Sequence, residues 1–178
     1  VGIVEEKKIP NGKKIKKDDL ILAVPSSGLH SNGYSLIRKL IDIKKININK
    51  NKFLKKQLIK PTKIYVKEVL DLIDNNLLSG CANITGGGIV DNLKRILPYN
   101  LYAKIDLFKI NPLKIFHWLR SHNISDEEML KTFNCGVGFC LVINPKNLIK
   151  VIKFFPKKYK PYIIGKICSG TKQIKLHG

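Results

Sequence analysis

The residues best suited to chemistry in this sequence are gathered in one short stretch, PSSGLHSNGYSLIR, which covers residues 25–38. It holds hydroxyls, an amide, glycines and His30, the one histidine of four that lies among such residues. A histidine in this setting can transfer protons near neutral pH, and glycines let a phosphate approach the backbone closely. The same side chains could instead only cap a turn and satisfy its backbone groups. Their spacing alone leaves both interpretations open.

The elements around this stretch are predicted to be a strand, a turn and a helix. The continuous apolar run 20–24 is typical of a strand buried on both faces. Apolar residues recur at helical spacing over 36–41, so we expect a helix to begin near Asn32 or Gly33, with Ser31 or Asn32 as its N-cap. The free N–H groups at the start of that helix would attract an anion.

The order of strand, glycine-rich turn and helix occurs a second time. A strand expected at 81–85 leads into Gly86–Gly88, and a helix with an apolar face follows and ends before Pro98. The glycines could be a flexible connector. Alternatively, their N–H groups and the Thr85 hydroxyl could bind a phosphate or an amide oxygen that gains charge.

A third segment with glycines, Asn134–Gly138, precedes the apolar run 139–143. These glycines either form a bulge or admit a ligand. Because the first two turns each follow a strand and open a helix, we expect 27–33 and 85–88 to lie together at one edge of the sheet. A separation above about 20 Å would contradict a shared site.

The remaining pattern predicts an α+β domain, in which helices cover a mixed sheet, because strands and helices alternate without regular repetition. A solvated loop is expected over 44–56, and Ser125 is expected to cap a helix in a capping box with Glu128. Further helices are expected at 54–59, from Pro61 to 77, at 112–120 with Pro112 as the first helical residue, at 125–133 and at 145–155. Further strands are expected at 1–9, 101–105, 162–168 and 173–176.

The formal charge of +20 suggests nucleic-acid binding, but the residue types argue against it. Of 33 basic residues only Arg38, Arg95 and Arg120 are arginine, the residue whose planar fork suits base recognition. The lysines are spread along the chain, together with abundant isoleucine and asparagine. We interpret the charge as compositional drift that still attracts phosphorylated metabolites.

Length and composition predict one globular domain of 178 residues, with no apolar run long enough to span a membrane. The four cysteines form no Cys-x-x-Cys pair and lie in or beside apolar runs, so buried, reduced thiols and a reducing cytoplasm are expected. The chain begins at Val1 without an initiator methionine, so we expect further residues to precede it.

Three stretches carry a resemblance to a known family. They are SSGLHSNGYSLIRKL, ITGGGIVDNLKRILP at 84–98 and MLKTFNCGVGF at 129–139. In this order they resemble phosphoribosylformylglycinamidine cyclo-ligase, also called aminoimidazole ribonucleotide synthetase. The resemblance runs along the whole chain but covers only the C-terminal half of that family.

The resemblance implies a domain of three α-β-α layers and an ATP-dependent ring closure. In that reaction, formylglycinamidine ribonucleotide and ATP become aminoimidazole ribonucleotide, ADP and phosphate in de novo purine biosynthesis. The family's N-terminal domain carries most contacts to ATP and Mg²⁺ and the main dimer interface, and it has no counterpart in residues 1–178. A homodimer is therefore expected only of the full-length protein, and the isolated chain should be inactive.

The resemblance also assigns site residues. His30 would be the general acid–base group, whose replacement should lower turnover more than stability. Asn134 would orient an amide or ribosyl group. The substrate- and phosphate-binding residues would be Ser27, Gly28, Ser31, Asn32, Gly33, Thr85, Gly86, Gly87, Gly88, Asn134 and Gly136, and no metal ligand is predicted.

Two positions depart from the family pattern. Asn83 stands where the family commonly has histidine, and it cannot titrate near neutral pH. Lys131 stands where arginine is usual, so a bidentate contact is lost.

The alternatives to this family are a related ATP-dependent enzyme, such as selenophosphate synthetase or thiamine monophosphate kinase, and an inactive remnant or basic binding module. No specific nucleic acid and no membrane are expected as partners.

Overall fold

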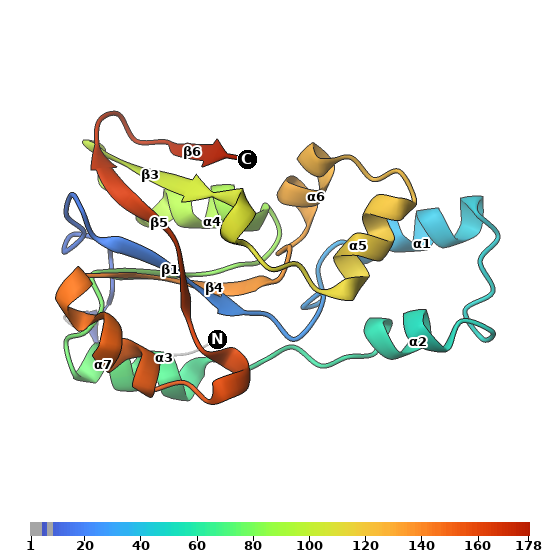
Figure 1. Ribbon diagram of the computed structural model, residues 1–178, viewed down its shortest axis with the longest axis horizontal. Coiled ribbons are helices and arrows are strands. Elements are labelled where there is room, and N and C mark those ends of the chain that lie inside the picture. The colour runs from blue at the N-terminus through green and yellow to red at the C-terminus, as the bar shows by residue number, and fades with distance from the viewer. Residues whose placement is uncertain (1–4, 7–8) are drawn as a thin grey trace.

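The computed structural model describes residues 5–6 and 9–178, and these residues form one mixed sheet with helices around it (Figure 1). The strands are β1 (Leu20–Pro25), β2 (Gly80–Asn83), β3 (Leu101–Asp106), β4 (Val137–Ile143), β5 (Tyr162–Ser169) and β6 (Ile174–His177). The helices are α1 (Tyr34–Ile43), α2 (Lys52–Leu58), α3 (Val66–Asp74), α4 (Gly88–Ile96), α5 (Lys114–Ser121), α6 (Asp126–Thr132) and α7 (Leu148–Lys153). Three 3₁₀ turns are η2 (Leu107–Lys109), η3 (Pro145–Asn147) and η4 (Lys157–Tyr159). The strand expected over 1–9 falls mostly outside the described residues.

The sheet has the strand order β2-β4-β1-β5-β3-β6, in which β3 and β6 pair in parallel and the other neighbours are antiparallel. Since β1 and β2 are both antiparallel to β4, which lies between them, they run in the same direction. Their C-terminal ends therefore meet at one edge of the sheet. This topology places the turns after β1 and β2 side by side.

Helices cover both faces of the sheet, which confirms the predicted α+β class. On one face, α3 and α7 pack Leu72 and Val151 against apolar residues of β1 and β4. On the other face, α4 packs Ile89 and Leu93 against alternate residues of the same strands and of β3 and β5. Residues 21–24 of β1 are 0% exposed, as the apolar run predicted.

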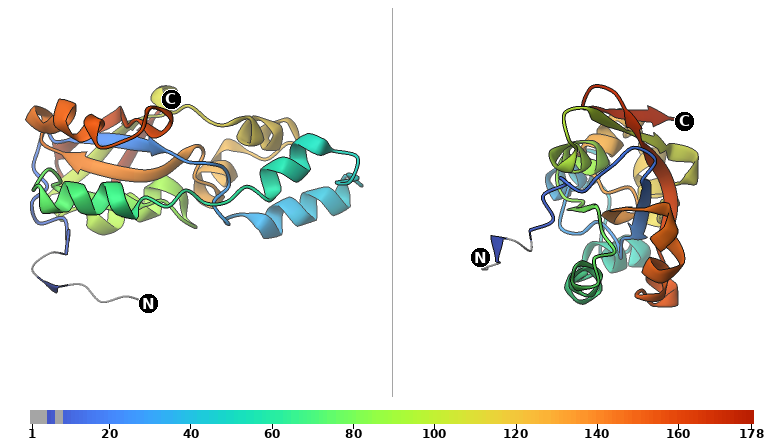
Figure 2. Two further views of the ribbon diagram at one scale, coloured as in Figure 1. Left: turned by 90° about the horizontal axis from the view of Figure 1, so that it is seen from below. Right: turned by 90° about the vertical axis from the view of Figure 1, so that its left-hand side faces the viewer.

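Four helices form a second unit beyond one end of the sheet, as Figures 1 and 2 show. Helices α1, α2, α5 and α6 share their own core, which includes Ile37, Leu54, Phe116, Met129 and Phe133. The three-layer description therefore fits the sheet half of the molecule, and a helical half is added to it. No helix among the described residues is long and apolar enough to cross a membrane.

Several local predictions are corrected by long-range contacts. The N-cap of α1 is Gly33 rather than Ser31 or Asn32, and no side chain caps this helix. Helix α3 begins at Val66 rather than near Pro61, because the intervening segment is held extended by bonds to the turn after β1.

Two further expectations concern the helices α5 and α6. Helix α5 begins at Lys114, two residues after Pro112. Ser125 caps α6 as predicted and accepts a hydrogen bond from the Glu128 N–H at 3.2 Å. The reciprocal half of the capping box does not form, since the Glu128 carboxylate accepts from the Thr132 hydroxyl instead.

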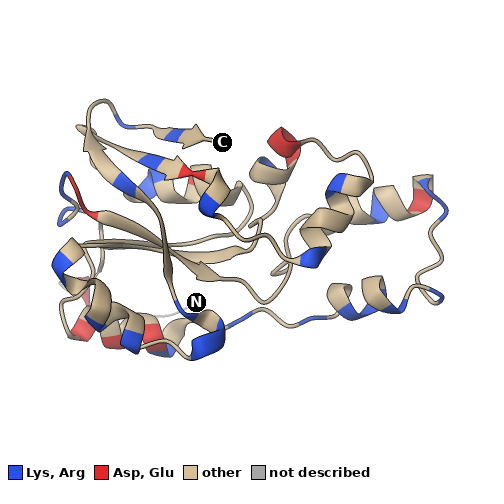
Figure 3. Ribbon diagram, in the orientation of Figure 1, with Lys and Arg blue, Asp and Glu red and all other residues tan. Residues whose placement is uncertain are grey.

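The cysteines follow the sequence-based expectation in part. All four are free, but only Cys135 and Cys140 are buried, whereas Cys81 and Cys168 are partly exposed. Figure 3 shows Lys and Arg distributed over most helices and strands rather than gathered on one element. This spread fits the interpretation of the net charge as a compositional feature.

Candidate functional site

The three motif segments meet at the edge of the sheet where β1 and β2 end and β4 begins. A Cβ placed on Gly86 would lie 3.9 Å from Asn32 Oδ1, so the turns 27–33 and 85–88 are in contact. The end of α6 closes the arrangement, because Phe133 packs directly on Gly33 and the Leu130 carbonyl on Gly88. The predicted shared position of the two turns is confirmed.

His30 is buried at the centre of the first turn, with φ 55°. Its Nε2 accepts a hydrogen bond from the Ser27 N–H at 2.9 Å and lies 3.0 Å from Ser27 Oγ. The Ser27 hydroxyl donates to the Pro61 carbonyl at 2.7 Å and accepts from the Lys63 N–H at 3.0 Å. Ser27 and His30 thus tie the turn to the segment that leads into α3.

This geometry fixes the protonation state of His30. A backbone N–H can only donate, so Nε2 is an acceptor and the neutral ring carries its proton on Nδ1. Burial lowers the pKa of His30 from 6.5 to about 4. At neutral pH the ring is therefore uncharged, and its Nε2 is already engaged by the protein.

A tyrosine that the sequence reasoning missed supports the same turn. The Tyr65 hydroxyl donates to the Pro25 carbonyl at 2.8 Å, and its ring centre lies 6.0 Å from that of His30. Gly138 makes room for both, since a Cβ there would lie 1.9 Å from the Tyr65 hydroxyl oxygen and 2.7 Å from His30 Cε1. Tyr65 follows a proline-containing segment without clear periodicity, so no local signal marked it.

The second turn is organised by Asn92, which the sequence reasoning also missed. This buried side chain of α4 donates from Nδ2 to the Gly86 carbonyl at 3.2 Å and the Gly88 carbonyl at 2.8 Å. Its Oδ1 accepts from the Thr85 hydroxyl at 3.2 Å. The sequence did contain a signal for Asn92, because this polar residue lies on the helix face that Ile89 and Leu93 make apolar.

Both turns present the N-terminus of a helix without a side-chain cap. The N-caps are Gly33 with φ 74° and Gly87 with φ 90°, conformations that favour glycine. The first N–H groups of α1 and α4 are thus directed at the shared edge, where they can bind an anion. The N-terminus of α4 carries Asp91 close to Gly87, whereas α1 has no acidic residue in its first turn. The α1 end therefore offers an anion less electrostatic repulsion than the α4 end.

The predicted site residues differ in access to a ligand. Ser31, Thr85 and Gly86 are exposed, and Asn32, Gly33 and Gly87 are partly exposed. Ser27, Gly28 and Gly88 are buried. The two positions that depart from the family pattern, Asn83 and Lys131, are both exposed.

The expected ligand roles of Asn134 and Gly136 stay predictions, and both residues are buried in the structure. Asn134 is 0% exposed, and its amide donates to the Gly28 carbonyl at 2.9 Å and accepts from the Gly136 N–H at 2.8 Å. The Gly136 carbonyl accepts from Ser26. Asn134 therefore ties the first turn to the 134–138 segment through buried hydrogen bonds. The glycines of this segment form the bulge, where the register with β1 shifts between Val24 and Pro25.

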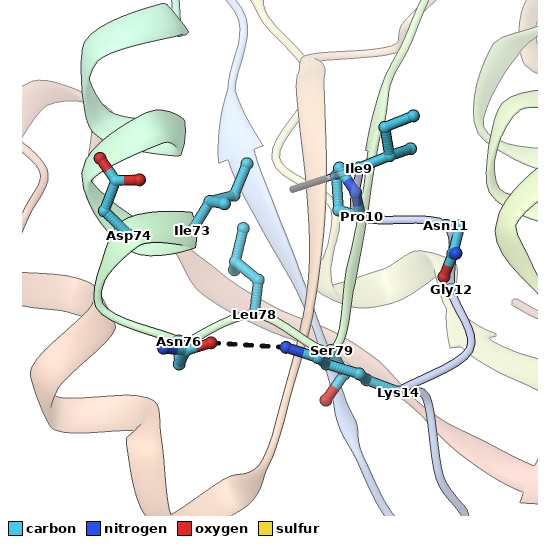
Figure 4. Close-up of a pocket in the computed structure, with 10 residues that line it drawn as sticks. All are labelled: Ile9, Pro10, Asn11, Gly12, Lys14, Ile73, Asp74, Asn76, Leu78 and Ser79. Atoms are coloured by element: carbon cyan, nitrogen blue, oxygen red, sulfur yellow. Dashed lines mark hydrogen bonds between the residues drawn. The ribbon is translucent and has the colours of Figure 1, made fainter. Parts of the chain in front are cut away.

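A separate pocket of about 240 Å³ lies at the other end of β2, as Figure 4 shows. It is lined by residues of 9–14 and of the α3–β2 connection, and Lys14 Nζ donates to Asn76 Oδ1 at 3.4 Å across it. None of the predicted site residues lines this pocket. Among the described residues, no group of three or more His, Cys, Asp or Glu could hold a metal ion.

The fold is shared with solved structures of low sequence identity. Thiamine-monophosphate kinase from Stenotrophomonas maltophilia K279a has a TM-score of 0.62 at 14% identity, over 94% of this chain and 52% of that chain. T. maritima PurL complexed with AMPPCP has a TM-score of 0.54 at 13% identity, over 98% of this chain and 26% of that chain. The complex of T. maritima PurL with FGAR has a TM-score of 0.55 at 13% identity, over 99% of this chain and 28% of that chain. These matches show that the chain has the fold of domains found in these proteins.

Sequence comparison gives the family. Residues 16–176 match the family described as AIR synthase related protein, C-terminal domain, and the chain belongs to this family. The phosphoribosylformylglycinamidine cyclo-ligase of Thermodesulfovibrio yellowstonii is 44% identical in an alignment 178 residues long that covers 96% of this chain and 52% of the relative. That of Carboxydothermus hydrogenoformans is 42% identical in an alignment 185 residues long that covers 99% of this chain and 54% of the relative. The predicted family resemblance is confirmed, and the chain spans about half the length of these relatives.

Proposed function

We propose that the chain is the C-terminal half of an ATP-dependent cyclo-ligase of de novo purine biosynthesis. The reaction would convert formylglycinamidine ribonucleotide and ATP to aminoimidazole ribonucleotide, ADP and phosphate. The observation that carries this proposal is the convergence of all three family stretches on one edge of the sheet. The cyclo-ligase relatives at 42–44% identity support the same assignment.

The shared edge suits the phosphate of a ribonucleotide. The free N–H groups of 33–35 and the partly or fully exposed Asn32, Ser31 and Thr85 are the donors in reach of such a group. They can also stabilise the negative charge on the oxygens of a phosphoryl group during its transfer to the amide oxygen. The role of these residues is positioning and charge stabilisation, on which phosphoryl transfer mainly depends.

ATP and Mg²⁺ belong mainly to the other half of the enzyme in this proposal. The described residues offer no cluster of carboxylates of the kind that Mg²⁺ requires, so they do not fit a metal site. No step through a metal is assigned to this chain. We further propose that the complete enzyme is a cytoplasmic homodimer whose second domain carries the dimer interface.

The test is an assay of the full-length protein. The full-length protein should form aminoimidazole ribonucleotide from formylglycinamidine ribonucleotide only when ATP is present, with one ADP released per ring closed. The variant Gly86→Asp should lower that rate, because Gly86 has room for a side chain and a carboxylate there repels phosphate. Phosphorylation of thiamine monophosphate by the same protein, without ring closure, would contradict the proposal.

A further inference from the structure

An apolar groove lies beside the two turns and has no part in the phosphate site described above. It has a volume of about 360 Å³ and lies between the start of α3 and the edge of the sheet formed by β2 and β4. The residues that matter to its chemistry are Ile64, Tyr65, Val66, Leu70, Asn83 and Phe139. We call it the α3 groove.

The walls of the α3 groove suit a flat, conjugated group. Ile64, Val66 and Leu70 are 72%, 60% and 51% exposed, which leaves large aliphatic side chains open to solvent on one side of α3. Tyr65 and Phe139 form the inner wall, with ring centres 5.4 Å apart. Aliphatic and aromatic surfaces of this kind bury the faces of a planar ring.

The polar groups of the α3 groove offer no unpaired positive charge to an anion. Lys63, at the rim, is already paired with Glu68 at 2.7 Å. Asn83 adds a side-chain amide, which offers both a donor and an acceptor and is exposed. The groove therefore combines apolar walls with one uncharged hydrogen-bonding group.

The α3 groove is continuous with the phosphate site through two links. Asn83 stands two residues before Thr85, which in extended chain is about 7 Å. Tyr65 lines the groove, and its ring centre lies 6.0 Å from that of His30 in the first turn. One molecule could thus place a phosphate at the turns and a planar group in the groove.

We infer that the α3 groove binds the nitrogen-containing base of the ribonucleotide whose phosphate lies at the two turns. Before ring closure this group is the planar amidine, and afterwards it is the aminoimidazole ring. The Asn83 carbonyl would accept a hydrogen bond from an amino group of this base, and its NH₂ would donate to a ring nitrogen or formyl oxygen. The inference rests on the proposed function and names the part of the chain that recognises the base.

The experiment divides the ligand into its parts. Ribose 5-phosphate, 5-aminoimidazole-4-carboxamide riboside and the 5′-phosphate of that riboside are titrated separately into the chain, and backbone amide shifts are recorded by NMR. Ribose 5-phosphate should shift residues 28–34 and 85–88. The riboside should shift residues 64–70, 83 and 139. The nucleotide should shift both sets and bind at least about tenfold tighter than either part.

Two groove variants and one control make the test specific. Leu70→Glu and Asn83→Ala, both at exposed positions, should weaken nucleotide binding about five- to tenfold and leave ribose 5-phosphate binding unchanged. Ile43→Glu is the control, because Ile43 is 64% exposed at the far end of α1. It should change neither. If both groove variants bind the nucleotide as the parent does while ribose 5-phosphate still binds the turns, the groove assignment is overturned and the proposed function stands. If ribose 5-phosphate itself fails to bind the turns, the assignment of the phosphate site is overturned as well.

Discussion

His30 has its Nε2 held by the Ser27 N–H, and this contact changes what the residue can do. A proton on Nε2 would oppose the Ser27 N–H, so Nδ1 is the one ring nitrogen left for proton exchange. With a pKa of about 4, the ring is neutral at pH 7 and cannot serve there as an acid in its charged form. We therefore expect His30 to act as a positioning residue, which holds the turn against the segment before α3.

The first prediction concerns the pH dependence of stability. The pKa of His30 is about 4 in the folded chain, and its ordinary value of 6.5 applies to the unfolded chain. The unfolded chain therefore takes up the proton first as the pH falls. The free energy of unfolding should therefore decrease from pH 6.5 to pH 4, by at most about 3 kcal/mol for this residue. In His30→Gln this part of the decrease should disappear. Urea unfolding of both proteins across that pH range measures it, and parallel curves would contradict the prediction.

The second prediction separates positioning from catalysis in the full-length protein. Replacing His30 with glutamine should lower the melting temperature, because the acceptor for the Ser27 N–H is misplaced. The effect on turnover should appear in KM more than in kcat, since a loosened turn binds phosphate less well. A loss of about 10²-fold in kcat with an unchanged melting temperature would instead restore the acid–base role.

The third prediction uses the space around two glycines. Gly138→Ala puts a methyl group 1.9 Å from the Tyr65 hydroxyl oxygen, so it should destabilise the chain by about 1–3 kcal/mol. Gly86→Ala meets only Asn32 Oδ1 at 3.9 Å and should change stability by less than about 0.5 kcal/mol. Thermal unfolding of the pair checks it, and equal melting temperatures would mean that Tyr65 moves aside freely.

At the scale of elements, Asn92 links the start of α4 to the turn that precedes it. One amide serves the carbonyls of Gly86 and Gly88 and the Thr85 hydroxyl. Removal of such a buried amide leaves several backbone groups without partners. The shape of the 85–88 turn therefore depends on a side chain that is itself buried.

The fourth prediction follows from that link. Asn92→Leu has nearly the same size, so it should keep the packing of α4 yet weaken binding of ribose 5-phosphate several-fold by loosening the turn. The control is Lys94→Leu, at an exposed position of the same helix. Calorimetric titration of both variants with ribose 5-phosphate measures the two affinities. Unchanged affinity in Asn92→Leu would show that the turn keeps its shape without the amide.

The sequence predicted elements whose cause is local and missed those set by distant contacts. The apolar run of β1, the Ser125 cap and the strand–turn–helix order around Gly86–Gly88 all follow from short-range patterns, and the structure confirms them. The predicted N-cap of α1 and the predicted start of α3 were wrong, because both depend on contacts with residues distant in sequence. These contacts are made by Phe133 and by the Ser27 hydroxyl. The placement of both turns at one edge could be predicted, since it needs only strand direction.

Burial of the site residues could not be predicted in the same way. Asn134 belongs to a stretch that resembles a ligand-binding motif, yet its partner is the Gly28 carbonyl, 106 residues away in sequence. A family motif contains residues that the fold needs and residues that the site needs. The motif alone does not show which residue serves which purpose. Asn134 and His30 both make buried hydrogen bonds within the protein, and their roles toward a ligand stay predictions.

At the scale of the molecule, the candidate site lies where the sheet half meets the helical half. Helices α1 and α6 reach it from the helical core, while β1, β2 and β4 reach it from the sheet. Residues 59–65 pass from α2 to α3 and are bonded to the first turn on the way. A change in how the two halves pack would therefore alter the phosphate site directly.

The fifth prediction concerns what this chain can do alone. The net charge of +20 and the open N-termini of α1 and α4 give the chain an attraction for phosphate groups. Because its described residues hold no carboxylate cluster for Mg²⁺, it should not release phosphate from ATP above the background rate. A phosphate-release assay on the purified chain should therefore stay flat, while ribose 5-phosphate binds weakly and less so at high salt. Addition of the separately expressed N-terminal half should restore ATP-dependent ring closure, and steady phosphate release without that half would show that the chain carries a nucleotide site of its own.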